Sequence, residues 1–300
     1  MVLRFLVPAL SAALLGACAT PPSGPPDPKS AAAAYQDPQP PPDEVIDWGP
    51  YARQFGELRL PDGDGPFPVV VLLHGGCWLA DYGHGYMAGL AEAVRGLGFA
   101  VWTVGYRRVG EPGGGWPNTF YDVAEGTDYL RELARTHPID PDRVIALGHS
   151  AGGQLALWLA ARSTAPADSL FHAPDPLPID GVVTLAAAAD LERLSYRKAC
   201  DDAATRLIGG PPDRYPERYA EASPLARVPL GVPQVLIDGT RDTTWIVPSD
   251  TYFEAALAAG DPVRRKIVRY AGHFELVDPR SNSWPVVRDA LLELAEAKVP

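Results

Sequence analysis

The sequence predicts an α/β domain built on one doubly wound, mostly parallel sheet with helices on both faces. Short continuous apolar runs, typical of strands buried on both faces of a parallel sheet, recur along the chain. Segments with helical spacing of apolar residues alternate with these runs, and this alternation indicates parallel crossovers. The 300 residues, 46% of them hydrophobic, are enough to bury one large core.

The folded domain is expected to span residues 45–300 and to begin with an alternating strand over 55–60. Buried strands are expected at 68–73, 99–104, 144–147, 181–185, 233–238 and 265–270. Helices are expected at 86–97, 119–135, 151–162, 249–259 and 284–297. The loop 106–116 would either border a substrate cleft or simply connect elements. Residues 190–230 interrupt the alternation, as a partial lid or as a crossover with one helix near 202–208.

The N-terminal residues predict export and attachment to a membrane. Residues 1–17 have one basic residue followed by an apolar run, the outline of a secretory signal peptide. Leu15-Gly16-Ala17-Cys18 resembles the bacterial lipobox, in which the cysteine is lipidated and becomes the new N-terminus. The alternative is ordinary cleavage at the small-residue pattern Ala17-Cys18-Ala19. Residues 18–44 are proline-dense and poor in apolar side chains, so we expect a disordered tether. The chain is therefore expected to be a lipoprotein of the bacterial cell envelope, held to a membrane through lipid on Cys18.

Charge and cysteine content argue against several other classes of protein. The chain has 26 Lys and Arg against 37 Asp and Glu, a formal charge of −11, and no basic stripe, so a nucleic-acid partner is not expected. No cysteine lies in a cluster of metal-ligand spacing, so neither a metal nor another cofactor is expected. Two interpretations of Cys77 stay open, a buried small apolar residue or a disulfide with Cys200.

Gly148-His149-Ser150-Ala151-Gly152 lies between a predicted strand and a predicted helix. Gly-x-Ser-x-Gly in this context predicts a nucleophile elbow, with Ser150 as the nucleophile and His149 at the variable position. The serine must take a strained backbone conformation, and the glycines let strand and helix pass without Cβ clashes. The following helix would direct its N-terminal N–H groups at developing negative charge.

Asp242 and His273 are the predicted partners of the serine. A serine hydroxyl is a weak nucleophile until a base takes its proton, and the base needs an orienting acid. Both residues follow predicted strands, in the chain order Ser, Asp, His that this topology requires. Asp190 and Asp238 are the alternatives for the acid. Asp242 is preferred because it stands in the loop where the topology puts the acid, whereas Asp238 reads as a turn residue bonding local backbone.

His74-Gly75-Gly76-Cys77-Trp78 follows a predicted buried strand and is the expected oxyanion loop. Its glycines would let the backbone approach a reacting carbonyl, and the N–H of Ala151, next to the nucleophile, would be a further donor. His74 is expected to hold the loop without taking part in the chemistry.

Four motifs together resemble the α/β-hydrolase superfamily: His-Gly-Gly-x-Trp at 74–78, Gly-His-Ser-Ala-Gly-Gly at 148–153, Asp-Gly-x-x-Asp at 238–242 and Gly-His-Phe at 272–274. Within it, the resemblance is to the esterase branch of carboxylesterases, hormone-sensitive-lipase-like enzymes and kynurenine formamidases. It covers about residue 45 to the C-terminus and implies the α/β-hydrolase fold, with Gly76 and Cys77 as the oxyanion donors of the loop. Because Cys77 stands where the lipase branch often has a third glycine, the chain resembles the formamidase and carboxylesterase side more closely.

The leading hypothesis is a serine hydrolase that cleaves a small-molecule carboxylic ester through Ser150, His273 and Asp242 and an acyl-enzyme intermediate. The alternatives are an amidase, aryl formamidase or peptidase on the same triad, or a surface-anchored binding protein that retains the fold without catalysis. The sequence does not indicate the oligomeric state.

Overall fold

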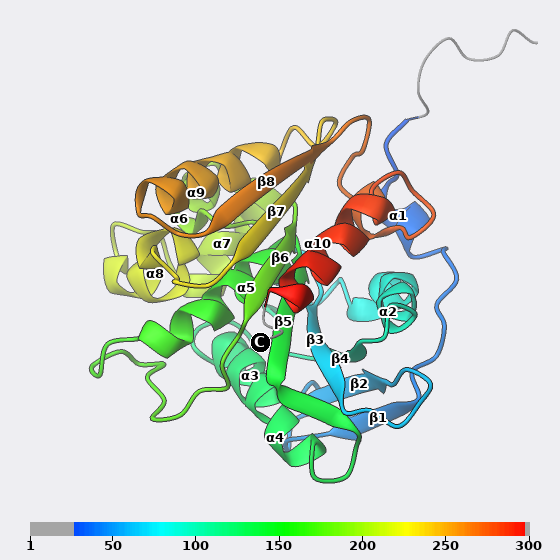
Figure 1. Ribbon diagram of the computed structural model, residues 1–300. Helices are drawn as coiled ribbons and strands as arrows, with labels where there is room; N and C mark the ends of the chain where they lie inside the picture. The colour runs from blue at the N-terminus through cyan, green and yellow to red at the C-terminus, as the bar shows by residue number, and fades with distance from the viewer. Residues whose placement is uncertain (1–26, 298–300) are drawn as a thin grey trace, which may run out of the picture.

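The computed structural model describes residues 27–297, so the predicted signal peptide and the lipid site at Cys18 lie outside the described residues. Within this range the chain forms one eight-stranded sheet of order β1-β2-β4-β3-β5-β6-β7-β8. The pairs β1–β2 and β2–β4 are antiparallel, and every other neighbouring pair is parallel. Helices cover both faces of the sheet (Figure 1), which confirms the predicted doubly wound class.

The strands are β1 (Glu44–Asp47), β2 (Phe55–Arg59), β3 (Phe67–Leu73), β4 (Ala100–Val104), β5 (Ile139–His149), β6 (Gly181–Leu185), β7 (Gln234–Gly239) and β8 (Val263–Val268). The runs predicted at 68–73, 99–104, 181–185 and 233–238 coincide with buried central strands. The strand predicted as buried at 265–270 is instead the edge strand β8, in which only the first and last side chains are buried. Strand β5 begins earlier than predicted because its first residues pair with Phe67 and Pro68, before a register shift. Strand β1 was missed because it is a short edge strand with mostly exposed side chains.

The helices are α1 (Ala31–Ala34), α2 (Ala88–Arg95), α3 (Asn118–Asp128), α4 (Leu130–Leu133), α5 (Ala151–Ala161), α6 (Leu191–Tyr196), α7 (Ala199–Ile208), α8 (Pro216–Ala222), α9 (Ile246–Ala258) and α10 (Trp284–Glu296). Figure 1 shows α2 and α10 on one face of the sheet and α3, α5 and α9 on the other. Helix α5 is buried along its whole length, as its apolar sequence requires. It therefore packs the residue after the nucleophile firmly against the central strands.

The structure corrects the expected disordered tether over residues 27–43. Helix α1 packs on the domain, where the side chain of Ala34 is buried in the core. The hydroxyl of Tyr35 both donates to the carbonyl and accepts from the N–H of Gly83, at 2.8 and 2.9 Å. Lys29 forms ion pairs, one of them with a carboxylate of the domain. The expectation failed because composition indicates only whether a segment can bury enough apolar surface to fold by itself. It does not indicate whether the segment can bind to a domain that has already folded.

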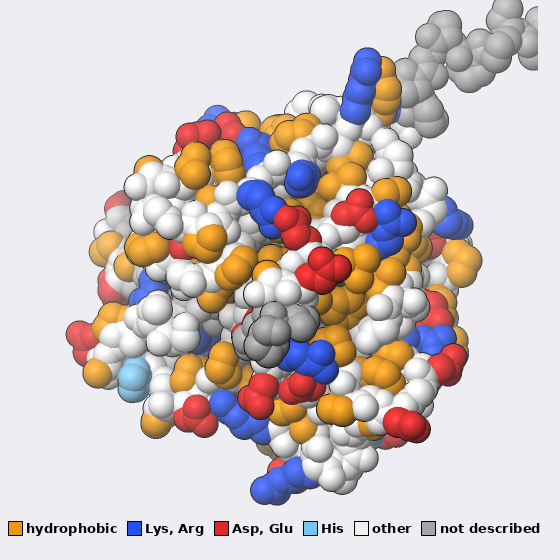
Figure 2. Space-filling model, viewed as in Figure 1, with side chains coloured by type: hydrophobic (Ala, Val, Ile, Leu, Met, Phe, Trp, Pro, Cys, Tyr) orange, Lys and Arg blue, Asp and Glu red, His pale blue; other side chains and the backbone are white. Residues whose placement is uncertain are grey.

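The described part of the chain has neither a helix long and apolar enough to cross a bilayer nor a group of His, Cys, Asp and Glu side chains placed to hold a metal ion. On the face seen in Figure 2, Lys and Arg side chains are interspersed with Asp and Glu. Such a mixture of charges does not form a basic track of the kind that follows a phosphate backbone.

Candidate active site

Ser150 forms the turn between β5 and α5, with φ 55° and ψ −117°. Few non-glycine residues adopt this backbone conformation, which stores strain at the tip of the turn. A Cβ atom on Gly148 would lie 2.0 Å from the carbonyl oxygen of Gly152, and one on Gly152 would lie 2.1 Å from that of Leu73. Only glycine at both positions lets β3, β5 and α5 approach so closely, which is the steric requirement expected of an elbow.

His273 and Asp242, which follow β8 and β7, are hydrogen-bonded to each other. Nδ1 of His273 lies 2.5 Å from Oδ2 of the buried Asp242 carboxylate, whose Oδ1 accepts the N–H of Trp245 at 3.3 Å. A carboxylate accepts the Nδ1 proton, so the lone pair of the neutral ring lies on Nε2, the tautomer a general base needs. His273 and Ser150 line the same pocket. The structure thus brings together the three residues predicted as a triad.

The two alternative acids have structural partners elsewhere. Asp190 caps α6 by accepting the backbone N–H of Arg193 at 3.0 Å. Asp238 is buried and accepts hydrogen bonds from Ser249 Oγ and Arg265 Nε, both at 2.9 Å. Burial raises the pKa of Asp238, against the opposing effect of Arg265. Both carboxylates therefore stabilise local structure. The hydrogen bonds of Asp238 are made with side chains, and not with the local backbone as the sequence suggested.

Gly76 and Cys77, which follow β3, line the pocket together with Ser150. Both have positive φ, 103° and 55°, and a Cβ atom on Gly76 would lie 2.2 Å from that of Tyr82. Among the described residues, no protein acceptor binds the backbone N–H groups of Gly76, Cys77 or Ala151. Unpartnered N–H groups around a nucleophile are the donors that an oxyanion hole requires.

His74 and Trp78 hold this oxyanion loop from behind. Nδ1–H of His74 donates to the carbonyl of Gly75 at 2.7 Å, and its ring stacks on Tyr106 with centroids 4.5 Å apart. Burial lowers the pKa of His74 to about 3, so the ring is neutral at physiological pH. Nε1–H of Trp78 donates to Gln154 of α5 at 3.0 Å. His74 therefore lies where it can fix the loop, as expected, and it does not line the pocket.

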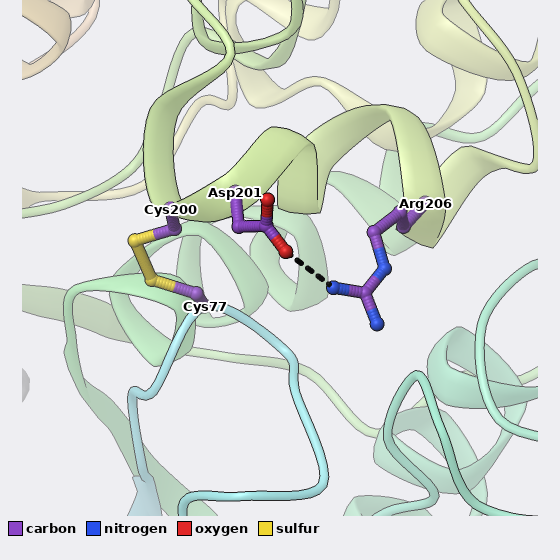
Figure 3. The surroundings of a disulfide bond; sticks show 4 residues. All are labelled: Cys77, Cys200, Asp201 and Arg206. Atoms are coloured by element: carbon purple, nitrogen blue, oxygen red, sulfur yellow. Dashed lines mark hydrogen bonds and ion pairs between the residues drawn. A yellow bond between two sulfur atoms is a disulfide. The ribbon is translucent and has the colours of Figure 1, made fainter.

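Cys77 forms a disulfide with Cys200 (Figure 3), so one of the two open interpretations is realised in the structure. The bond joins the oxyanion loop to the start of α7 across a sequence separation of 123 residues. Cys200 also lines the pocket. Residues 190–230 therefore border the site at this point, and they contain α6, α7 and α8, not the single helix of the simple crossover.

Sequence reasoning missed a chain of hydrogen bonds behind the serine. The hydroxyl of Tyr86 accepts the N–H of Gly75 at 2.8 Å and donates to Nδ1 of His149 at 2.7 Å. Nε2–H of His149 then donates to the backbone carbonyl of His273 at 3.2 Å. Burial holds the pKa of His149 well below its ordinary value, so the ring stays neutral. The variable position of the elbow thus connects the oxyanion loop to the loop that carries His273.

The pocket over Ser150 has a volume of about 190 Å³. Small-molecule sites commonly measure about 300–1,000 Å³, so this one suits a small group. Beside the residues predicted from sequence, it is lined by Ala31, Tyr35, Tyr82, Tyr86, His149, Cys200, Trp245 and Phe274. Trp245 stacks on the ring of His273, with centroids 5.6 Å apart. The loop 106–116 does not line this pocket; its Trp116 packs on Phe120 and Phe171, so the loop connects elements.

Comparison with known proteins finds one matching family and several similar esterases. Residues 58–255 match the family described as BD-FAE. The esterase LipC of Mycobacterium tuberculosis is 29% identical over 229 residues, which are 71% of this chain and 54% of LipC, so the chain spans about half the length of that relative. LipR of the same organism is 26% identical over 239 residues, covering 75% of this chain and 71% of LipR.

Solved structures of low sequence identity share the fold. Esterase B from Lactobacillus rhamnosis superposes with a TM-score of 0.75 at 20% identity, covering 89% of each chain. A carbohydrate esterase from gut microbiota gives a TM-score of 0.71 at 19% identity, covering 83% of this chain and 94% of the other. The family match extends over well more than half of the chain and includes the oxyanion loop, the elbow and Asp242. The chain therefore belongs to the BD-FAE family, within the α/β-hydrolase esterases that its motifs resemble.

Proposed function

We propose that this protein hydrolyses carboxylic esters, with Ser150 as nucleophile, His273 as general base and acid, and Asp242 as the residue that orients His273. The observation that carries the proposal is the hydrogen bond between Asp242 and Nδ1 of His273, in a pocket that His273 shares with Ser150. A binding protein has no need of an oriented base beside a strained serine. The likeness to LipC and to esterase structures supports the same reaction class.

In the proposed reaction, Oγ of Ser150 attacks the ester carbonyl carbon while its proton passes to Nε2 of His273. The carbonyl oxygen becomes an anion that accepts hydrogen bonds from the unpartnered N–H groups of Gly76, Cys77 and Ala151, each donor stabilising the transition state by about 2.7–4 kcal/mol. The carbon–oxygen bond to the alcohol then breaks, and the alcohol leaves with the proton from His273. The acyl group stays on Ser150.

The second half of the reaction repeats these roles with water. His273 takes a proton from a water molecule as the water oxygen attacks the acyl carbon, and the bond to Ser150 breaks. Oγ recovers its proton from His273, and the carboxylic acid is released. In both halves the buried Asp242 carboxylate stabilises the positive charge that develops on the His273 ring.

A fluorophosphonate probe and the variant Ser150→Ala test this proposal. We expect the probe to label the wild type, Ser150→Ala to remain unlabelled, and hydrolysis of p-nitrophenyl acetate by the variant to fall about 10⁴-fold or more. Equal labelling of both proteins would contradict a nucleophilic role for Ser150. Faster turnover of a formylated arylamine than of p-nitrophenyl acetate would favour an amidase on the same triad.

We also propose that the protein is exported and anchored by lipid on Cys18. The lipobox-like sequence supports this proposal, and so does the Cys77–Cys200 disulfide, because such bonds persist in oxidising compartments. Metabolic labelling with a radioactive fatty acid should mark the wild type. Cys18→Ala should lose the label and move from the membrane fraction to the soluble fraction. Unchanged partitioning of an unlabelled Cys18→Ala protein would contradict the lipid anchor.

A further inference from the structure

Residues 28–40, here called the N-terminal strap, form one wall of the pocket over Ser150. Ala31 and Tyr35 of the strap line this pocket together with Ser150 and His273. The ring of Tyr35 packs against that of Tyr86, with centroids 5.3 Å apart. The strap lies outside the part of the chain that matches the BD-FAE family, residues 58–255. A segment beyond the family match therefore borders the reactive centre.

The strap is bonded to the loop that carries His273. The backbone N–H of Lys29 donates to the Glu275 carboxylate at 2.5 Å, and its ammonium lies 2.6 Å from Asp278 and pairs also with Asp37 of the strap. Arg280 forms ion pairs with the same two aspartates. Pro28 lies against Gly272, where an added Cβ atom would come within 2.7 Å of the proline ring. The cluster of Lys29, Asp37, Asp278 and Arg280 thus clamps the strap beside the proposed base.

Few contacts hold the strap closed. Its main apolar contributions are the buried Ala34 and the partly buried Tyr35, whose hydroxyl is bonded to Gly83. The charges of the clamp are partly accessible to water, with 13–58% of each side chain exposed. The Lys29–Asp278 pair is largely buried, whereas 58% of the Arg280 side chain is exposed, so salt screens chiefly the pairs of Arg280 and these contribute little to stability. The strap is therefore an attached wall that opens more readily than the core behind it.

We propose that the strap, through the ring of Tyr35, sets the upper length of the ester that reaches Ser150. This inference rests on the proposed esterase function. At about 190 Å³ the pocket lies below the range of about 300–1,000 Å³ common for small-molecule sites, so it suits a short ester group. A longer chain that extends toward the strap meets the ring of Tyr35. A second cavity of about 200 Å³, lined by Asp37 and Pro38 of the strap, shares Tyr86 with the first.

The substitution Tyr35→Ala tests the wall. The full-length variant and the wild type are compared on two ester series, p-nitrophenyl esters from acetate to decanoate and acetates of alcohols of increasing length. In at least one series, we expect kcat/KM for the longest ester relative to the shortest to rise about tenfold or more in Tyr35→Ala. Tyr35→Phe should shift this ratio less, because it keeps the ring. Tyr196→Ala, which removes an exposed tyrosine outside the pocket, is the matched control. Identical ratios in Tyr35→Ala and the wild type for both series would overturn the inference.

Hydrogen–deuterium exchange of residues 28–40 tests the strap without relying on ester turnover. We expect slow exchange at low salt and faster exchange in about 0.5 M NaCl, because salt at this concentration screens the exposed pairs of Arg280. Lys29→Met should exchange rapidly at both salt concentrations, whereas Arg288→Met, which removes a partly exposed arginine paired with its neighbour Asp289, should behave as wild type. Strap amides that exchange as fast as an unfolded peptide in the wild type would overturn the inference even if Ser150 reacts with the probe. A wild type that turns over no ester contradicts the proposed function, whereas protected strap amides would still support closure of the pocket.

Discussion

Among single residues, burial separates the roles of the histidines around Ser150. His74 and His149 are buried, burial lowers the pKa of both, and both ring nitrogens of His149 are hydrogen-bonded. Neither can exchange a proton with a substrate without losing those contacts. His273 is only partly buried, is held at Nδ1 by Asp242, and lines the pocket. It is therefore the histidine that can pass a proton to and from a reacting group.

Asp242→Asn should lower kcat for p-nitrophenyl acetate by about 10⁴-fold, because an amide no longer selects the tautomer of His273 with its lone pair on Nε2. Asp238→Asn is the matched control, since it changes the rival carboxylate that is bonded to Ser249 and Arg265. We expect it to destabilise the fold by about 1–3 kcal/mol while kcat stays within about tenfold of wild type. Steady-state kinetics and urea unfolding measure both effects. A larger loss of kcat in Asp238→Asn than in Asp242→Asn would contradict the assignment of the acid.

Among the structural elements, the oxyanion loop after β3 is restrained by contacts with several parts of the fold. Trp78 ties it to α5, Tyr86 binds its Gly75 N–H, and the disulfide from Cys77 ties it to α7. Its donors must hold a fixed position before the anion forms, because reorganisation during the reaction would cancel their benefit. The elements that pack around the loop therefore contribute to the proposed catalysis without touching the substrate.

Cys200→Ser should reduce both stability and turnover. Removing a cross-link of this span is expected to lower the free energy of unfolding by about 2–4 kcal/mol. Without the cross-link, the N–H of Cys77 is held less firmly in position. Because this N–H binds the anion of the transition state and not the ground-state ester, kcat should fall by up to about 10²-fold with a smaller change in KM. A phosphine reductant should lower the stability and kcat of the wild type by similar amounts and should leave those of the variant unchanged. Unchanged kcat in fully reduced wild type would show that the bond does not position the loop.

In the molecule as a whole, the sheet collects the site from distant segments. The oxyanion loop, Ser150, Asp242 and His273 follow β3, β5, β7 and β8, which run parallel, so all four lie at the carboxyl edge of one sheet. The N-terminal strap closes that edge from outside the sheet, where Figure 1 shows α1 beside the chain that leads to α10. Because one sheet positions all of these residues, unfolding of the sheet should separate all of them at once.

The stability of the whole domain should decrease as pH falls below about 6.5. His74 and His149 have lowered pKa values in the folded state, so below the ordinary value of about 6.5 the unfolded chain binds more protons than the folded one. Above that pH both states are neutral and the effect vanishes; below it, each histidine removes up to about 1.4 kcal/mol per pH unit. Urea unfolding at pH 7, 6 and 5 measures the slope. His149→Gln should reduce the slope, and His172→Gln, at an exposed position, should leave it unchanged. A wild-type stability independent of pH over this range would contradict the buried neutral state of both rings.

The sequence alone determined the features that depend on local sterics and chain order. Apolar runs identified the buried strands, and the glycines around Ser150 identified a turn whose close approaches tolerate no Cβ atom. The order of Ser150, Asp242 and His273 on loops after strands was enough to bring them to one edge of a parallel sheet. Each of these inferences needed only neighbouring residues and a fold class.

Only the tertiary structure decided the contacts between segments that are far apart in the sequence. The Cys77–Cys200 bond, the link from His149 to His273 and the docking of Lys29 on Glu275 span 123, 124 and 246 residues of sequence. Periodicity and motifs do not decide such pairs, and the sequence left the Cys77–Cys200 bond open, because each pair depends on the relative placement of loops after the core has formed. For the same reason composition predicted a disordered tether where the N-terminal strap docks: its binding surface exists only in the folded domain.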